Sequence, residues 1–136
     1  MEIKTFKALM KKLDLELTLT EENLIEKSKK LPMLYNEYLD IFSKELRSLK
    51  KLSADKHKKF GELYKHFKYF DNHNWETKGE IETQILAHDE YYALVVEFNE
   101  QETMVKQLEM ALENIKRTSF QIKNIIEYKK FVEVGF

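Results

Sequence analysis

The residues with the clearest chemical potential are cations and aromatic side chains gathered in residues 41–70. This segment carries nine Lys and Arg residues against three acids, a net charge of +6. The cations are Lys44, Arg47, Lys50, Lys51, Lys56, Lys58, Lys59, Lys65 and Lys68. The aromatic residues are Phe60, Tyr64, Phe67, Tyr69 and Phe70. Because cations bind phosphates and aromatic faces stack on bases, this mixture is typical of a surface for single-stranded nucleic acid.

The following segment has the opposite charge. Residues 76–113 carry ten Asp and Glu residues against Lys78 and Lys106, a net charge of −8, so the whole chain has a formal net charge of only −1. General acid–base catalysis needs carboxylates in a pocket with perturbed pKa values, and these are spread around helices. We expect an exposed acidic face, which in an alternative structural role would pair with the basic segment of a neighbouring subunit.

Residue types that support other chemistry are missing or badly spaced. The three Gly residues are isolated, so no phosphate-binding glycine loop is expected, and the chain has no Cys nucleophile or thiolate ligand. The four histidines have no metal-ligating spacing. We interpret them as exposed, although His57 and His66 can add donors to a phosphate-binding surface. The chain is therefore predicted to have no catalytic site, no metal and no cofactor.

The elements that position these residues are expected to be long helices. A chain of 136 residues with three Gly and one Pro has little material for turns, which favours a single all-α domain over residues 1–136. Apolar spacing predicts a short helix over residues 1–13, a connector at 15–20 in spite of its strand-like alternation, and a helix from about Glu21. Pro32 suits a first helical turn, so a long basic helix is expected over about 32–70, with Gly61 as a weak point.

The second half of the chain is also expected to be helical. A turn at 71–74 and a short helix over about 77–86 precede a long helix over about 89–131, capped by Asp89. In the basic helix, Phe60, Leu63, Phe67 and Phe70 fall on the buried stripe. Tyr64 and Tyr69 lie off that stripe beside Lys65 and Lys68, and are the expected stacking residues.

The long C-terminal helix has a heptad seam sustained over about five heptads. The seam runs through Tyr91, Leu94, Phe98, Gln101, Val105, Leu108, Leu112, Ile115, Ser119, Ile122 and Ile126. Two helices of this length in so short a chain need partners for their apolar faces. We therefore expect a helical-bundle homo-oligomer, with Leu108, Leu112, Ile115 and Ile122 as oligomerising positions.

No targeting or membrane segment is expected. The N-terminus lacks an uninterrupted apolar core, and the longest strongly apolar stretch, residues 91–96, is too short to span a membrane. The absence of Cys fits a reducing cytoplasm. The basic helix lies in mid-chain and lacks Trp, which disfavours a membrane-surface role.

Three stretches resemble the UvsY family of recombination mediators from T-even-like phages. The first is Pro32-Met-Leu-Tyr35 with Tyr38-Leu39, and the second is Leu63-Tyr-Lys-His-Phe-Lys-Tyr-Phe70. The most specific comprises Ile115-Lys-Arg-Thr-Ser-Phe120, Gln121-Ile-Lys-Asn-Ile-Ile126, Glu127-Tyr-Lys-Lys-Phe131 and Gly135. The likeness covers about residues 30–136.

The resemblance implies a non-enzymatic mediator of homologous recombination and repair in the cytoplasm of the infected host. Such a mediator binds single-stranded DNA as a ring of six or seven subunits. It also binds the phage RecA-like recombinase and the phage single-stranded-DNA-binding protein, and helps the first replace the second. The family's DNA contacts carry over to Tyr64, Lys65, His66 and Lys68. Its oligomerising helix carries over to residues 89–131.

One departure from the family concerns His66, which stands where the family can have Arg. A neutral His is a weaker phosphate partner, so Lys65 and Lys68 carry more of the binding. The predicted DNA contacts are Lys58, Lys59, Tyr64, Lys65, His66, Lys68 and Tyr69. The alternative is a helical assembly adaptor that never meets DNA and uses its sorted charge only for subunit packing.

Overall fold

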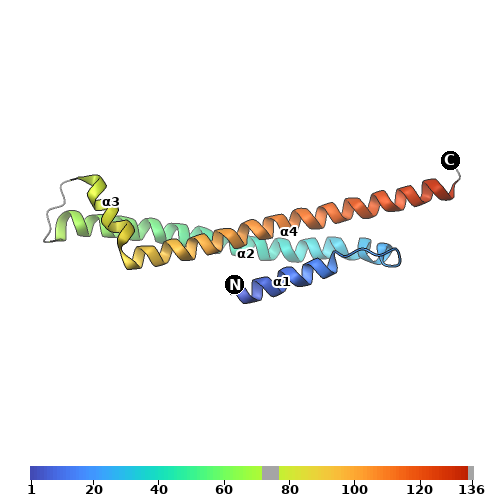
Figure 1. Ribbon diagram of the computed structural model, residues 1–136, viewed down its shortest axis with the longest axis horizontal. Coiled ribbons are helices and arrows are strands. Elements are labelled where there is room, and N and C mark those ends of the chain that lie inside the picture. Colours follow the sequence, from blue (N-terminus) through green and yellow to red (C-terminus); the bar gives the residue numbers. More distant parts are fainter. Residues whose placement is uncertain (72–76, 135–136) are drawn as a thin grey trace. The chain divides into compact units, whose positions relative to one another are not determined.

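Helices make up all the regular structure that the computed structural model describes, which covers residues 1–71 and 77–134 (Figure 1). The elements are α1 (Ile3–Glu16), α2 (Leu24–Lys65), a five-residue π-helix η1 (His66–Phe70), α3 (Lys78–Ala87) and α4 (Asp89–Glu133). The predicted all-α class is confirmed. The turn expected at 71–74 falls almost wholly outside the described residues.

The chain divides into two compact units, which we describe separately. Unit 1 comprises residues 1–44 and 104–136, and unit 2 comprises residues 45–103. Helices α2 and α4 each contribute a segment to both units. The short helices α1 and α3 belong to unit 1 and unit 2, respectively.

Helix α2 begins at Leu24 and runs through Pro32, so the start expected at Pro32 is wrong. Proline has no N–H, and an interior position therefore removes the helical donor to the carbonyl of Ser28. Packing explains why the helix continues. Leu24 and Leu31 lie seven residues apart on one face and are both buried in the core of unit 1. This burial outweighs the local preference of proline for a helix start.

A connector separates the first two helices as expected, but the predicted range of 15–20 is wrong at its start, because α1 continues to Glu16. Residues 18–20 have no regular structure, and local hydrogen bonds replace strand pairing. The Thr20 N–H donates to Asn23 Oδ1 at 2.9 Å, and Lys27 Nζ donates to the Glu16 carbonyl at the end of α1 at 2.6 Å. A cation at a helix C-terminus is favourable because the last carbonyls lack helical partners.

The core of unit 1 is formed by α1 and the adjoining segments of α2 and α4. Phe6 and Leu13 of α1 pack in one cluster with Leu31 and Tyr38 of α2. Tyr38 Oη donates to the Leu9 carbonyl at 3.3 Å, and burial raises the pKa of Tyr38 to about 12. Helix α4 supplies the other side of this cluster with Met104, Leu108, Ala111, Leu112, Ile115 and Ile122.

The core of unit 2 supports the basic end of α2. Leu63 packs with Ile81 and Ile85 of α3 and with Tyr91 of α4. The rings of Phe60 and Tyr91 meet edge to face, with centroids 5.9 Å apart.

The starts of the two C-terminal helices differ in how well they were predicted. Helix α3 begins as expected, since Thr77 Oγ1 accepts the Glu80 N–H at 3.1 Å. Helix α4 begins with Asp89 as its first helical residue, so the cap position falls on His88. The Glu90 N–H donates to His88 Nδ1 at 3.3 Å. The capping role expected of Asp89 is therefore wrong.

Candidate nucleic-acid interface

The basic–aromatic stretch lies where α2 passes into the π-helix η1. Lys65, His66, Lys68 and Tyr69 are all exposed there, as a binding surface requires. The Asp71 N–H bonds to the His66 carbonyl at 2.8 Å, which closes a turn one residue wider than an α-helical turn. Such turns change the direction of the side chains that follow, and they recur at functional sites.

The wide turn explains why one predicted core residue is on the surface. Phe70 is 77% exposed, although its spacing placed it on the buried stripe. The stripe assumes 3.6 residues per turn, and the π-helical turn ends that period before Phe70 is reached. Phe70 and the 66%-exposed Tyr69 therefore both present aromatic faces at the end of η1. The sequence did hold a sign that Phe70 is exposed, because this residue stands directly before the expected turn.

The two predicted stacking tyrosines have different surroundings. Lys68 Nζ lies 5.3 Å from the ring centroid of Tyr69 and 5.8 Å from that of Tyr64. Tyr69 is otherwise open to solvent, whereas Tyr64 is half-buried and packs against the Leu63 cluster. Tyr64 can therefore offer only part of its ring to a base. Tyr69 and Phe70 are the more accessible stacking surfaces.

The adjacent lysines Lys58 and Lys59 have separate environments. Lys59 Nζ forms an ion pair with Glu90 of α4. A hydrogen bond within this pair raises the pKa of Lys59 and lowers the pKa of Glu90. Lys58 is exposed, and no ion pair involves it among the residues that the structure describes. The ammonium of Lys56 also turns toward α4, 4.1 Å from the Phe98 ring centroid. Part of the basic segment therefore serves packing within the chain.

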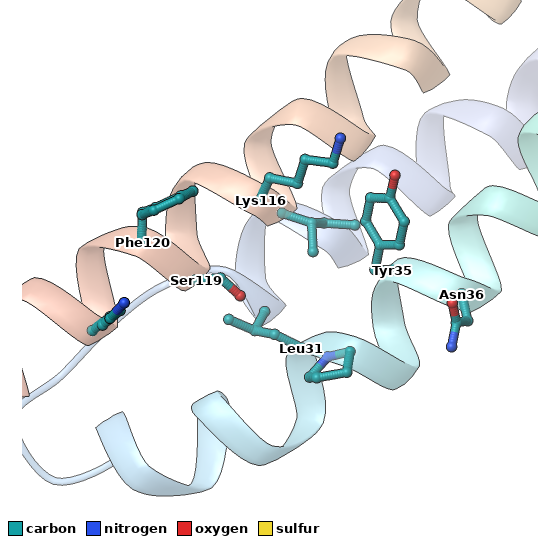
Figure 2. Close-up of a pocket in the computed structure, with 9 residues that line it drawn as sticks. Leu31, Tyr35, Asn36, Lys116, Ser119 and Phe120 are labelled. Carbon is teal, nitrogen blue, oxygen red and sulfur yellow. The ribbon is translucent and has the colours of Figure 1, made fainter.

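A second candidate site is an open groove of about 530 Å³ in unit 1. Leu31, Pro32 and Tyr35 of α2 line it from one side, and Ile115 and Phe120 of α4 from the other. Figure 2 shows Tyr35 and Lys116 facing each other across this groove, with the Lys116 ammonium 5.6 Å from the tyrosine ring centroid. Apolar side chains line most of the groove, so its chemistry suits a protein segment better than a phosphate backbone.

The four residues predicted to drive oligomerisation lie in the core of a single chain. Leu108 and Ile115 are almost completely buried there, and Leu112 and Ile122 pack in the same cluster. This part of the heptad seam thus packs against α1 and α2 within unit 1. The part of these four residues in assembly stays a prediction.

Two other kinds of site are absent from residues 1–71 and 77–134. No three His, Asp or Glu side chains come together there in a way that would hold a metal ion. Nor does any helix in these ranges have the length and apolar character needed to cross a membrane.

The all-helical fold and the basic–aromatic stretch at the end of α2 define a class of proteins in which a long helix ends in exposed cations and aromatic rings. A family model described as "Recombination, repair and ssDNA binding protein UvsY" matches residues 12–135. The chain belongs to the UvsY family. A comparison with curated protein sequences found no match.

Solved structures share the fold. One crystal structure of the bacteriophage T4 recombination mediator protein UvsY has a TM-score of 0.82 at 19% identity, covering 99% of each chain. Another has a TM-score of 0.81 at 18% identity and covers 92% of this chain and 96% of that chain. The long helices and their order are therefore features that this chain shares with the phage T4 mediator.

Proposed function

We propose that the chain binds single-stranded DNA through the exposed end of α2 and through η1. The observation that carries this proposal is the joint exposure of Lys65, Lys68, Tyr69 and Phe70 at one helix end. Lysines release counterions from phosphates, and aromatic faces stack on any base. Membership of a family described as ssDNA binding supports the same function.

Binding of this kind suits a mediator of recombination. We propose that the protein occupies DNA coated by a single-strand-binding protein and helps a RecA-like recombinase to load onto it. The support is the fold shared with the phage T4 mediator. Contacts to phosphates and base faces carry no sequence information, as a protein that acts on any single strand requires.

A pair of substitutions tests the site. Lys65→Ala with Lys68→Ala should weaken oligothymidine binding and lower the slope of log affinity against log salt by about 0.7 for each lost phosphate contact. The matched control is Lys4→Ala with Lys7→Ala, which removes the same charge from exposed positions of α1. If both double variants bind alike, the lysines of the α2 end are not the DNA site.

We also propose that a second copy of the chain covers the apolar surface of α4 in unit 1. Met110, Phe120, Tyr128 and Val132 are large apolar side chains that α4 exposes in this unit. Phe120 also lines the groove shown in Figure 2. Burial of these side chains against a second copy would remove their apolar surface from water. A homo-oligomer would repeat the DNA site, so that weak contacts on each subunit add up along one strand.

A further inference from the structure

Four cations of α2 in unit 2, Arg47, Lys51, Lys58 and Lys65, share the solvent side of the helix with two small residues, Ala54 and Gly61. Successive members are separated by alternating steps of four and three residues, which keeps them on one face. All members are exposed, and together we call them the outer stripe: Arg47, Lys51, Ala54, Lys58, Gly61 and Lys65. The buried Leu63 and the packed Phe60 lie on the opposite side, toward α3 and α4.

The two flanks of the outer stripe differ in chemistry. The acids Asp55 and Glu62 lie seven residues apart on one flank and would repel a phosphate backbone. His57 and Tyr64, also seven residues apart, lie on the other flank. No ion pair joins Asp55 or Glu62 to the outer stripe in the described part of the chain. The stripe cations therefore keep their donors available.

No contact within the chain explains why position 61 is a glycine. Glycine is less favourable than alanine within a helix, and a Cβ built at Gly61 meets nothing within 4 Å. Neither packing nor backbone conformation requires glycine here. Glycine does let another backbone approach a helix closely. In the outer stripe, Gly61 lies between Lys58 and Lys65, and Ala54 lies between Lys51 and Lys58, so each small residue leaves a notch between two cations.

We propose that single-stranded DNA runs along the axis of α2 on the outer stripe, from Arg47 to Lys65, approaches the helix closely at Gly61 and continues to Lys68 in η1. Successive stripe lysines that lie seven residues apart are about 10.5 Å apart along the axis. The phosphates lie on the cations, and the bases point to the flank of His57 and Tyr64, away from Asp55 and Glu62. This path rests on the proposed DNA-binding function and extends the site to Arg47 and Lys51.

Substitutions at the Arg47 end of the path test how far the DNA extends along α2. Arg47→Ala with Lys51→Ala should weaken oligothymidine binding and lower the salt slope by about 0.7 for each lost contact, while the α1 control, Lys4→Ala with Lys7→Ala, changes neither. If the Arg47 and Lys51 variant matches the control while the Lys65 and Lys68 variant binds weakly, the long path is wrong and the DNA-binding function stands. If the unaltered protein does not bind DNA, both proposals fail.

The glycine notch has a matched control in Gly79 of α3, where an added Cβ also meets nothing within 4 Å. Gly61→Gln places a long neutral side chain in the notch, and Gly79→Gln makes the same change away from the stripe. Both should keep the helical circular dichroism of the unaltered protein or raise its melting temperature. Only Gly61→Gln should weaken DNA binding, by several-fold. Equal affinities for the two variants would overturn the close approach at Gly61.

Discussion

Single residues of the basic segment have different tasks, although their types are alike. Lys59 pairs with Glu90, and Lys56 covers the Phe98 ring, so both stabilise the contact between α2 and α4 in unit 2. Lys58 faces solvent from the outer stripe. Charge counts from the sequence could not separate these tasks, because the partners on α4 are distant in the chain.

Lys58 and Lys59 therefore form a matched pair for substitution. Lys58→Ala should lower DNA affinity and reduce the salt slope by about 0.7, with an unchanged melting temperature. Lys59→Ala should lower the melting temperature slightly through loss of its pair with Glu90, and leave the salt slope near that of the unaltered protein. Fluorescence anisotropy and thermal circular dichroism measure both properties. A larger loss of affinity for Lys59→Ala would reverse the assignment.

Tyr38 predicts a dependence of stability on alkaline pH. Its folded-state pKa of about 12 lies above the ordinary value of 10.0, because burial disfavours the phenolate. The stability that this shift contributes is complete below pH 10 and is lost as the pH rises toward 12. In urea unfolding at pH 9 and pH 11.5, Tyr38→Phe should lose less stability between the two pH values than the unaltered protein. Equal losses would contradict the buried hydroxyl.

At the scale of elements, the apolar periodicity was a sound guide where helices are regular. It predicted α3 and α4 closely and indicated the buried seam of α4. The periodicity failed at Phe70, where a π-helical turn breaks the period. The preference of proline for a first helical turn failed at Pro32, because burial of Leu24 and Leu31 keeps α2 intact there. Both failures depend on contacts or backbone geometry that no local pattern records.

Gln101, the one polar amide in the predicted seam, sets the register of α2 against α4 in unit 2. Its Nε2 donates to the Glu45 carboxylate at 2.7 Å and to the Glu45 carbonyl at 2.9 Å, and Glu45 is buried. A polar residue at such a position is a known way to fix the register of paired helices.

Gln101→Leu should destabilise the protein by about 2 kcal/mol, because the buried carboxylate of Glu45 loses this donor. Urea unfolding of the variant and of the unaltered protein measures the loss. Equal stability of the two proteins would contradict the role of this hydrogen-bonded pair.

At the scale of the whole molecule, the buried seam and the exposed face of α4 have separate roles. The seam residues of unit 1 complete its core, and the exposed apolar residues form the surface that we propose a second copy covers. The sequence could indicate that α4 has too wide an apolar surface for one neighbour. The sequence could not show which side of α4 is buried in unit 1 and which side is exposed, because that depends on how α1 and α2 pack.

Two substitutions separate folding from assembly. Phe120→Asp with Tyr128→Asp should lower the mass found by light scattering and keep the helical signal, since both side chains are exposed. Leu112→Asp should lose the helical signal, because it buries an unpaired charge in the core of unit 1. If the exposed double variant keeps the mass of the unaltered protein, this face of α4 does not drive assembly.

The most direct test of DNA binding is a titration of the unaltered protein with labelled oligothymidine over a range of salt concentrations. We predict tight binding near physiological salt that weakens linearly in log–log form as salt rises. An oligonucleotide of mixed sequence without secondary structure should bind with nearly the same affinity. An absence of binding even at low salt would contradict the account. It would favour a helical adaptor in which the sorted charge serves packing alone.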